Sequence, residues 1–170
     1  MEIKPVVNSF LFEQLKKEIE NGKWIEDREK LCIAHETKWT IAHEQARRGW
    51  KTEDKEILKL TDEFGYTVAH IQAEQGWTTE DKEILMLATE DGLTVAHEQA
   101  NHGWITTDPE ILSLTNKYGN TVYETILSYW NYFAPESDIL KNYNLLLTVI
   151  EKGKKLIKKE NSETLTLKLN

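Results

Sequence analysis

The chain has 170 residues, of which 39% are hydrophobic and 29% are charged, and its formal net charge is −8. This balance is typical of one globular domain and excludes a disordered polyelectrolyte. No apolar run approaches the ~20 residues of a membrane span, and no signal peptide is recognisable after Met1. We therefore expect a cytoplasmic protein that does not bind membranes.

The negative charge is concentrated in the first part of the chain. Residues 1–120 carry a net charge of −9, whereas residues 121–170 carry +1. An acidic body repels the phosphates of nucleic acids and anionic lipids, so we expect no direct binding to DNA or RNA. The same charge permits a basic protein partner.

The N-terminal segment predicts an amphipathic helix over residues 9–19, with Ser9 as its N-cap. Residues 9–33 form a degenerate copy of the repeat described below, with Asp27 close to register. Cys32 stands between Leu31 and Ile33, which favours packing in the core over a reactive thiol. We assign residues 9–39 to an N-terminal cap.

Residues 40–120 repeat with a period of 27 residues, and these core repeats dominate the sequence. The aligned columns are Thr40, Thr67, Thr94 and Thr121; Gly65, Gly92 and Gly119; Trp50, Trp77 and Trp104; and Asp54, Asp81 and Asp108. So many matched columns exclude chance similarity.

Each repeat predicts two short helices. The first begins at the repeated Thr, a good N-cap, and ends before the Gly-Trp pair. The second begins near the repeated Asp, and Pro109 directly after Asp108 fits the first helical position. We expect Gly65 and its equivalents to end the second helix. Because such short helices are unstable alone, neighbouring units must stack.

The C-terminal region departs from the repeat. Thr121 opens a helix through about Asn131, and Pro135 ends it. A longer helix is predicted from Ser137 or Asp138 to roughly Lys159. We assign residues 121–160 to a C-terminal helical cap and residues 161–170 to a tail, either a short strand or a loose segment. The whole chain, 1–170, is one repeat domain.

The repeat resembles a known family. Its segment Gly-x-Thr-Val-Ala-His-x-Gln-Ala-x-x-Gly-Trp resembles the ankyrin signature Gly-x-Thr-Pro-Leu-His-x-Ala-Ala-x-x-Gly-His, over about residues 40–126. Val replaces Pro, Trp replaces His, and each unit is six residues shorter than the usual 33. The resemblance implies an all-α helical-repeat solenoid of paired short helices with helical caps, in which the hairpins are reduced or absent. It also implies protein–protein recognition.

The repeated polar residues have structural explanations. Equivalent residues in stacked helices lie roughly 8–10 Å apart, so His43, His70 and His97 cannot share one metal ion. Each His follows its Thr by three positions, where it can stabilise the helix start, and Glu124 replaces it in the fourth unit. The Trp column is expected to pack on the helix ends, and the repeated Asp and Glu suit helix N-termini. We expect no catalytic residue, no metal site and no cofactor.

Positions that vary between units are the candidates for recognition. They lie before the Gly-Trp pair and around the Gly that precedes Thr. The candidate partner-binding residues are Arg47, Arg48, Phe64, Tyr66, Glu74, Gln75, Leu93, Asn101, His102 and Tyr118. The favoured function is a non-catalytic protein-binding module. The alternatives are an acidic inhibitor that occupies another protein's nucleic-acid-binding surface, an enzyme, and self-association through an exposed end of the stack.

Overall fold

The computed structural model describes the backbone of residues 3–168 and the side chains of residues 3–156. It is mostly helical, which confirms the all-α class. No helix in this part of the chain is both long and apolar enough to cross a membrane. The elements are β1 (Val6–Val7), α1 (Ser9–Glu20), α2 (Arg28–Leu31), β2 (Ile33–Ala34), α3 (Ile41–Arg47), α4 (Lys55–Leu58), α5 (Val68–Glu74), α6 (Lys82–Leu85), α7 (Val95–Asn101), α8 (Pro109–Leu112), α9 (Val122–Tyr132) and α10 (Glu136–Lys168).

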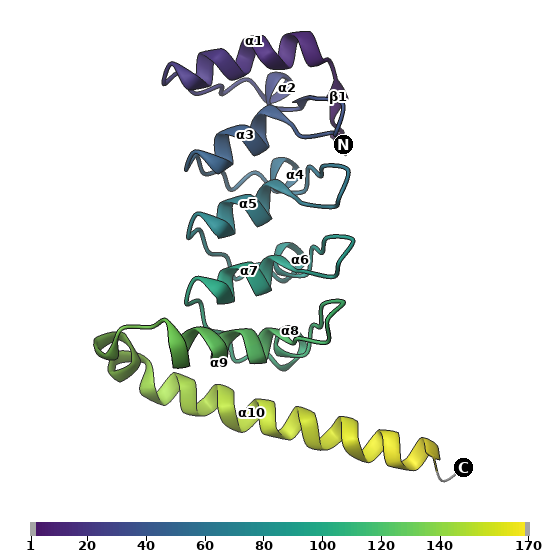
Figure 1. The fold of residues 1–170 in the computed structure, drawn as a ribbon, viewed down its shortest axis with the longest axis vertical. Helices are drawn as coiled ribbons and strands as arrows, with labels where there is room; N and C mark the ends of the chain where they lie inside the picture. Colours follow the sequence, from purple (N-terminus) through teal and green to yellow (C-terminus); the bar gives the residue numbers. More distant parts are fainter. Residues whose placement is uncertain (1–2, 169–170) are drawn as a thin grey trace.

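The helices are arranged in two columns that follow chain order (Figure 1). The longer helices α1, α3, α5, α7 and α9 form one column, and α3 packs on α5, α5 on α7, and α7 on α9. The single-turn helices α2, α4, α6 and α8 form the second column. The loops that lead back to the first column project to one side of the molecule (Figure 1).

The sequence explains both ends of each first helix. In α5, the Thr67 hydroxyl accepts a hydrogen bond from the amide of His70, as an N-cap should. At the other end, Gly76 adopts φ +74°, and the amide of Trp77 donates to the carbonyl of Gln72. This pattern is the glycine-dependent helix stop expected from the Gly-Trp pair.

Two predicted helix boundaries were wrong. The N-cap of α1 is Asn8 rather than Ser9, because its side-chain oxygen accepts from the amide of Leu11 at 3.0 Å. The second helices end well before Gly65 and its equivalents: α4 ends at Leu58, since the carbonyl of Leu60 accepts from the amide of Val68 and draws the chain into an extended bridge. Gly65, at φ +81°, lies in the following turn.

The loops are reduced hairpins rather than plain turns. Thr61 and Thr67 form a single antiparallel bridge, and the same bridge recurs in the neighbouring units. Successive loops are also joined to one another. The amide of Glu63 donates to the carbonyl of Thr37 at 2.9 Å, and the amide of Glu90 donates to the carbonyl of Phe64 at 3.1 Å. These bonds continue the stack of helices into a ladder of loops.

The N-terminal end contains a feature that the repeat pattern does not predict. β1 pairs with β2 in parallel, with Val6 opposite Ile33 and Val7 opposite Ala34. Cys32, next to β2, is buried as expected, and burial raises the pKa of its thiol. The thiol is therefore protonated at neutral pH, which agrees with a packing role.

The C-terminal end is covered by α10, which packs on α8 and α9. Leu146 and Val149 are buried there, and Gly153 lies so close to the Tyr123 ring that a Cβ atom would collide with it. α10 continues through Lys168, so the strand or loose segment predicted for 161–170 was wrong over 161–168. Residues 169 and 170 lie outside the described residues. Alternating Leu and Thr at 164–169 is compatible with a strand, but helical continuation prevails.

Candidate partner-binding face

The candidate partner-binding residues lie along the column of α3, α5 and α7 and at the loop tips beside it. Arg47, Arg48, Glu74, Gln75, Asn101 and His102 occupy the C-terminal ends of these helices. Phe64 and Tyr118 stand at loop tips, 58% and 73% exposed. Tyr66 and Leu93 are half-buried. We call this surface the inner-helix face.

Buried histidines hold this face in place. The Nδ1 atom of His43 accepts from the Thr40 amide at 3.2 Å and lies 2.7 Å from the Thr40 hydroxyl. Its Nε2 atom donates to the carbonyl of Tyr66, in the next unit, at 3.1 Å. His70 and His97 repeat this arrangement toward Leu93 and Asn120. The histidines therefore stabilise helix starts and join successive units, as the sequence predicted.

The environment keeps these imidazoles neutral. Burial lowers the pKa of His43 and of His70 to about 4, and it also lowers the pKa of His97. A charged ring could not accept at Nδ1, so the hydrogen bonds require the neutral form with its proton on Nε2.

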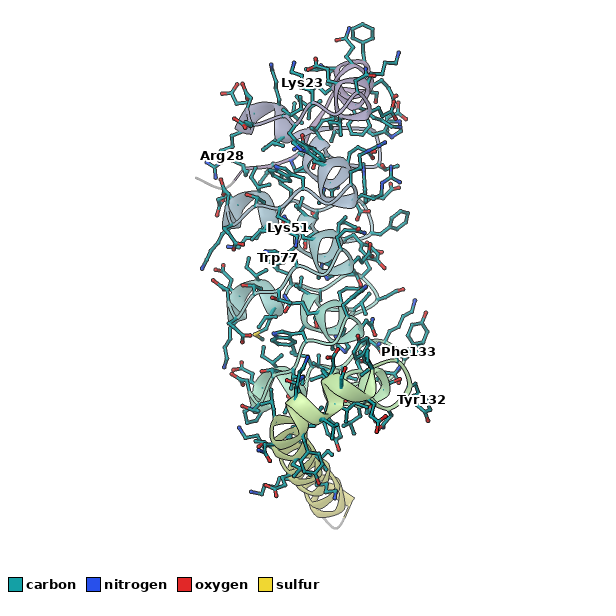
Figure 2. The ribbon with its side chains drawn as sticks, turned by 90° about the vertical axis from the view of Figure 1, so that its left-hand side faces the viewer. Lys23, Arg28, Lys51, Trp77, Tyr132 and Phe133 are labelled. Carbon is teal, nitrogen blue, oxygen red and sulfur yellow. The ribbon has the colours of Figure 1, made fainter. Side chains whose placement is uncertain are left out.

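The tryptophan column contributes to the scaffold. Trp77 and Trp104 are buried, and their indole N–H groups donate to Glu53 and Glu80 of the preceding units at 2.9 Å. Figure 2 shows Trp77 within the body of the molecule, whereas Tyr132 and Phe133 project from its edge. This placement supports the structural role expected for the column.

The first part of the face contains a hollow of about 430 Å³ that brings together Arg47 and Phe64 with Trp39 and Asp62. The Arg47 guanidinium lies 5.9 Å from the Trp39 ring centroid, a cation–π distance. Trp39 was not predicted as a site residue, although it lies 27 residues before Tyr66, in the same column as Tyr66 and Leu93.

Glu44 is the central charged residue of this region. It is only 2% exposed, yet it forms ion pairs with Arg47 at 2.8 Å and with Arg48 at 3.0 Å. These pairs and hydrogen bonds lower the pKa of its carboxyl even though burial acts in the opposite direction. The buried carboxylate is therefore neutralised from within the chain.

Glu98 occupies the equivalent position two units later, without the arginines. It is 7% exposed, and Asn101 and His102 stand where Glu44 has Arg47 and Arg48. Burial, and then the neighbouring Glu74, raise the pKa of Glu98 against the smaller effects of His102 and of a hydrogen bond with Asn101, and burial also raises the pKa of Glu74. Among the described residues, neither carboxylate has an ion-pair partner.

Further carboxylates surround Tyr66. Burial raises the pKa of its phenol, and Glu98, Glu74, Asp91 and Asp62 raise it further. We call these four carboxylates the acidic patch. Asp91 is paired with Lys117, and the Asp62 carboxylate accepts from the amides of Phe64 and Tyr66 at 2.9 Å, whereas Glu74 and Glu98 have no ion pair among the described residues. An aromatic ring beside unpaired carboxylates is a setting that favours an incoming cation.

The column of α4, α6 and α8 has a different charge pattern. Lys55 pairs with Asp81, and Lys82 pairs with both Asp108 and Glu110 at 2.8 Å. Positive and negative side chains therefore alternate from unit to unit. This side of the molecule is not a continuous anionic surface.

Within the described residues, no group of three or more His, Cys, Asp or Glu side chains is placed to hold a metal ion. The burial of Glu44 and Glu98 was missed from the sequence. The available signal was the contrast between Arg47-Arg48 and Asn101-His102, three and four residues after each Glu.

A scan against protein-family models gives no match to this chain, and a comparison with curated proteins gives none either. The function is therefore inferred from the chain's own residues and their geometry.

Proposed function

We propose that the chain is an ankyrin-like helical-repeat solenoid that binds a protein partner along the inner-helix face. The 27-residue period, the Thr-x-x-His start of each longer helix and the stacking in chain order support the solenoid. The reduced hairpins support the family resemblance, because the hydrogen bonds between them align the loop tips into one surface. Protein recognition is the common role of such surfaces.

The observation that carries the proposal is a difference in ion pairing between Glu44 and Glu98. Both carboxylates are buried at the same position of the repeat, but only Glu44 has arginine partners within the chain. A buried charge without a counter-ion is costly, and an incoming cation removes that cost. An arginine of the partner, placed between Glu98 and Glu74, would reproduce at the third unit what Arg47 and Arg48 do at the first.

The surroundings suit such an arginine. Tyr66 offers a half-buried ring beside the carboxylates, and Phe64 offers an exposed ring on the same loop. A guanidinium can stack on an aromatic face while it donates paired hydrogen bonds to a carboxylate. The partner is therefore a protein with an exposed basic segment. The acidic-inhibitor alternative lacks comparable support, because lysines interrupt the acidic side chains of α4, α6 and α8.

Affinity capture from the cells that produce the protein tests the proposal. The test variant is the double substitution Glu74→Gln/Glu98→Gln, which keeps side-chain size and removes both charges. The control is Glu83→Gln/Glu110→Gln, which removes two exposed charges from α6 and α8. We expect one protein with a basic segment to be retained by the wild type and the control and lost with the test variant.

Denaturant unfolding of the test variant distinguishes a loss of partner binding from a loss of folding. Because neutral glutamines relieve repulsion between buried carboxylates, the test variant should unfold at an equal or higher denaturant concentration than the wild type. A folded test variant that captures the same protein as the wild type would refute the role of the inner-helix face.

A further inference from the structure

Helix α10 carries apolar residues on two different sides. Leu146, Val149 and Gly153 are buried toward the body of the molecule. The second set comprises Leu140, Tyr143 and Leu147, at helical spacing, which are 70%, 55% and 41% exposed. At 100° per residue, this second set, which we call the outer stripe, is rotated by about 120° around the helix axis from the buried set.

An apolar outer stripe is unusual at the end of a stack, where a terminal unit needs a polar outer surface. The opposite end of this chain follows that rule. Apart from Phe10, the exposed residues of α1 are Glu13, Gln14, Lys17 and Glu20. The two ends therefore differ: among the described residues, α10 presents a row of exposed apolar side chains, whereas α1, at the other end of the stack in Figure 1, presents Phe10 alone.

Charged residues at the two ends of the outer stripe indicate which helix can pack against it. Glu136 is exposed seven residues before Tyr143, and Lys154 is exposed seven residues after Leu147. Seven residues are two helical turns, so both charges lie on the same side of α10 as the stripe. An identical helix laid antiparallel, with Tyr143 opposite Leu147 of the partner subunit, therefore also places Glu136 opposite Lys154 of the partner subunit.

We infer that the outer stripe is a dimer interface, covered by α10 of a second copy of the chain in a two-fold antiparallel pair. One register satisfies the apolar centre and both charged ends, and the two-fold axis repeats each contact. The apolar and charged residues of the outer stripe match those of an identical antiparallel helix. An unrelated helix would fit equally well only if it carried the same pattern of residues. Because one helix pair is a small interface, the dimer should exchange with monomer at micromolar concentrations. This inference is independent of the proposed function, which uses the column of α3, α5 and α7.

Sedimentation equilibrium of the full-length protein over a range of concentrations tests the interface. We expect a monomer–dimer equilibrium in the wild type. Leu147→Glu should abolish the dimer, whereas Phe10→Glu, which adds the same charge at the other end of the chain, should leave it unchanged. Circular dichroism establishes that both variants fold.

Charge reversal distinguishes the proposed register from other pairings. Glu136→Lys alone, or Lys154→Glu alone, places like charges opposite one another twice and should raise the dissociation constant about tenfold. The double variant Glu136→Lys/Lys154→Glu restores opposite charges and should recover the wild-type constant. A wild type that remains monomeric at about 1 mM, or a double variant as weak as the single variants, would overturn the inference. Glu74→Gln/Glu98→Gln should dimerise normally, which separates this result from the test of partner binding.

Discussion

At the scale of single residues, the histidine column should be a major source of stability. His70 is fully buried and bonds both the start of its own helix and the carbonyl of Leu93 in the next unit. His70→Ala leaves those partners unpaired and opens a cavity, so it should lower the free energy of unfolding by about 3 kcal/mol. Urea denaturation measures this. His102→Ala, at an exposed position, should change stability by less than about 0.5 kcal/mol, and equal effects would contradict the assignment.

The same histidines should make stability depend on pH. Folded His43 and His70 have a pKa of about 4, whereas an unfolded His titrates at about 6.5. The unfolded chain therefore binds more protons between these values, and stability falls as the pH drops through this window. From pH 7 to pH 5, each of the two should cost about 2 kcal/mol.

The pKa values of Glu74 and Glu98 are raised, so these carboxyls increase stability as the pH falls, opposite to the histidines. The measurement therefore compares the wild type with a His70 variant. His70→Gln should lose less stability between pH 7 and pH 5 than the wild type does. An unchanged pH dependence in His70→Gln would show that His70 is protonated in the folded protein.

The sequence predicted the role of His70 but not the state of Glu98. Thr and His three residues apart define a helix start, a local pattern that needs no tertiary information. The burial of Glu98 depends instead on how closely α5 and α7 approach and on the reach of Asn101 and His102. Packing of this kind has no signature within a single repeat.

At the scale of the elements, the hydrogen-bonded loops should tolerate alanine less well at Gly65 than at Gly119. Gly65 and Gly119 have nearly the same φ, +81° and +82°, so alanine is strained at both. Only at Gly65 would the new Cβ also press on the next loop, 3.1 Å from the Glu90 nitrogen. Gly65→Ala should therefore destabilise the protein by about 1 kcal/mol more than Gly119→Ala. Equal losses in chemical denaturation would contradict the contact.

The docking of α10 can be tested at Gly153. Alanine usually stabilises a helix interior by about 1 kcal/mol relative to glycine. Here its Cβ would collide with Tyr123, so Gly153→Ala should destabilise the protein, by about 1–3 kcal/mol. Tyr123→Leu in the same chain should recover part of this loss. A gain in thermal stability for Gly153→Ala alone would place α10 elsewhere.

Element boundaries were the least predictable part of the fold. Asp54 marked the start of α4 because its cap is local, but the helix ends at Leu58, two residues before the Leu60 carbonyl that accepts from the amide of Val68. The β1–β2 pair joins residues 27 positions apart, with α1 and α2 between them. Both features depend on contacts between segments rather than on local preference.

At the scale of the whole molecule, the repeat made the architecture predictable. The period predicted two helices in each unit and the order in which the units pack, because each unit contacts mainly its neighbours. The proposed partner-binding face required more than the period. Which varying side chains are buried, paired or left uncompensated became visible only when successive units were stacked.

Site-specific photo-crosslinking in the producing cells tests the central proposal most directly. A photoreactive amino acid replaces Gln75, on the inner-helix face, or Met86, an exposed residue on the other column. We predict a discrete protein adduct at Gln75, no such adduct at Met86, and loss of the Gln75 adduct when Glu74→Gln/Glu98→Gln is added. The same adduct at both positions, or an adduct at Gln75 that persists without the two carboxylates, would contradict binding at this face.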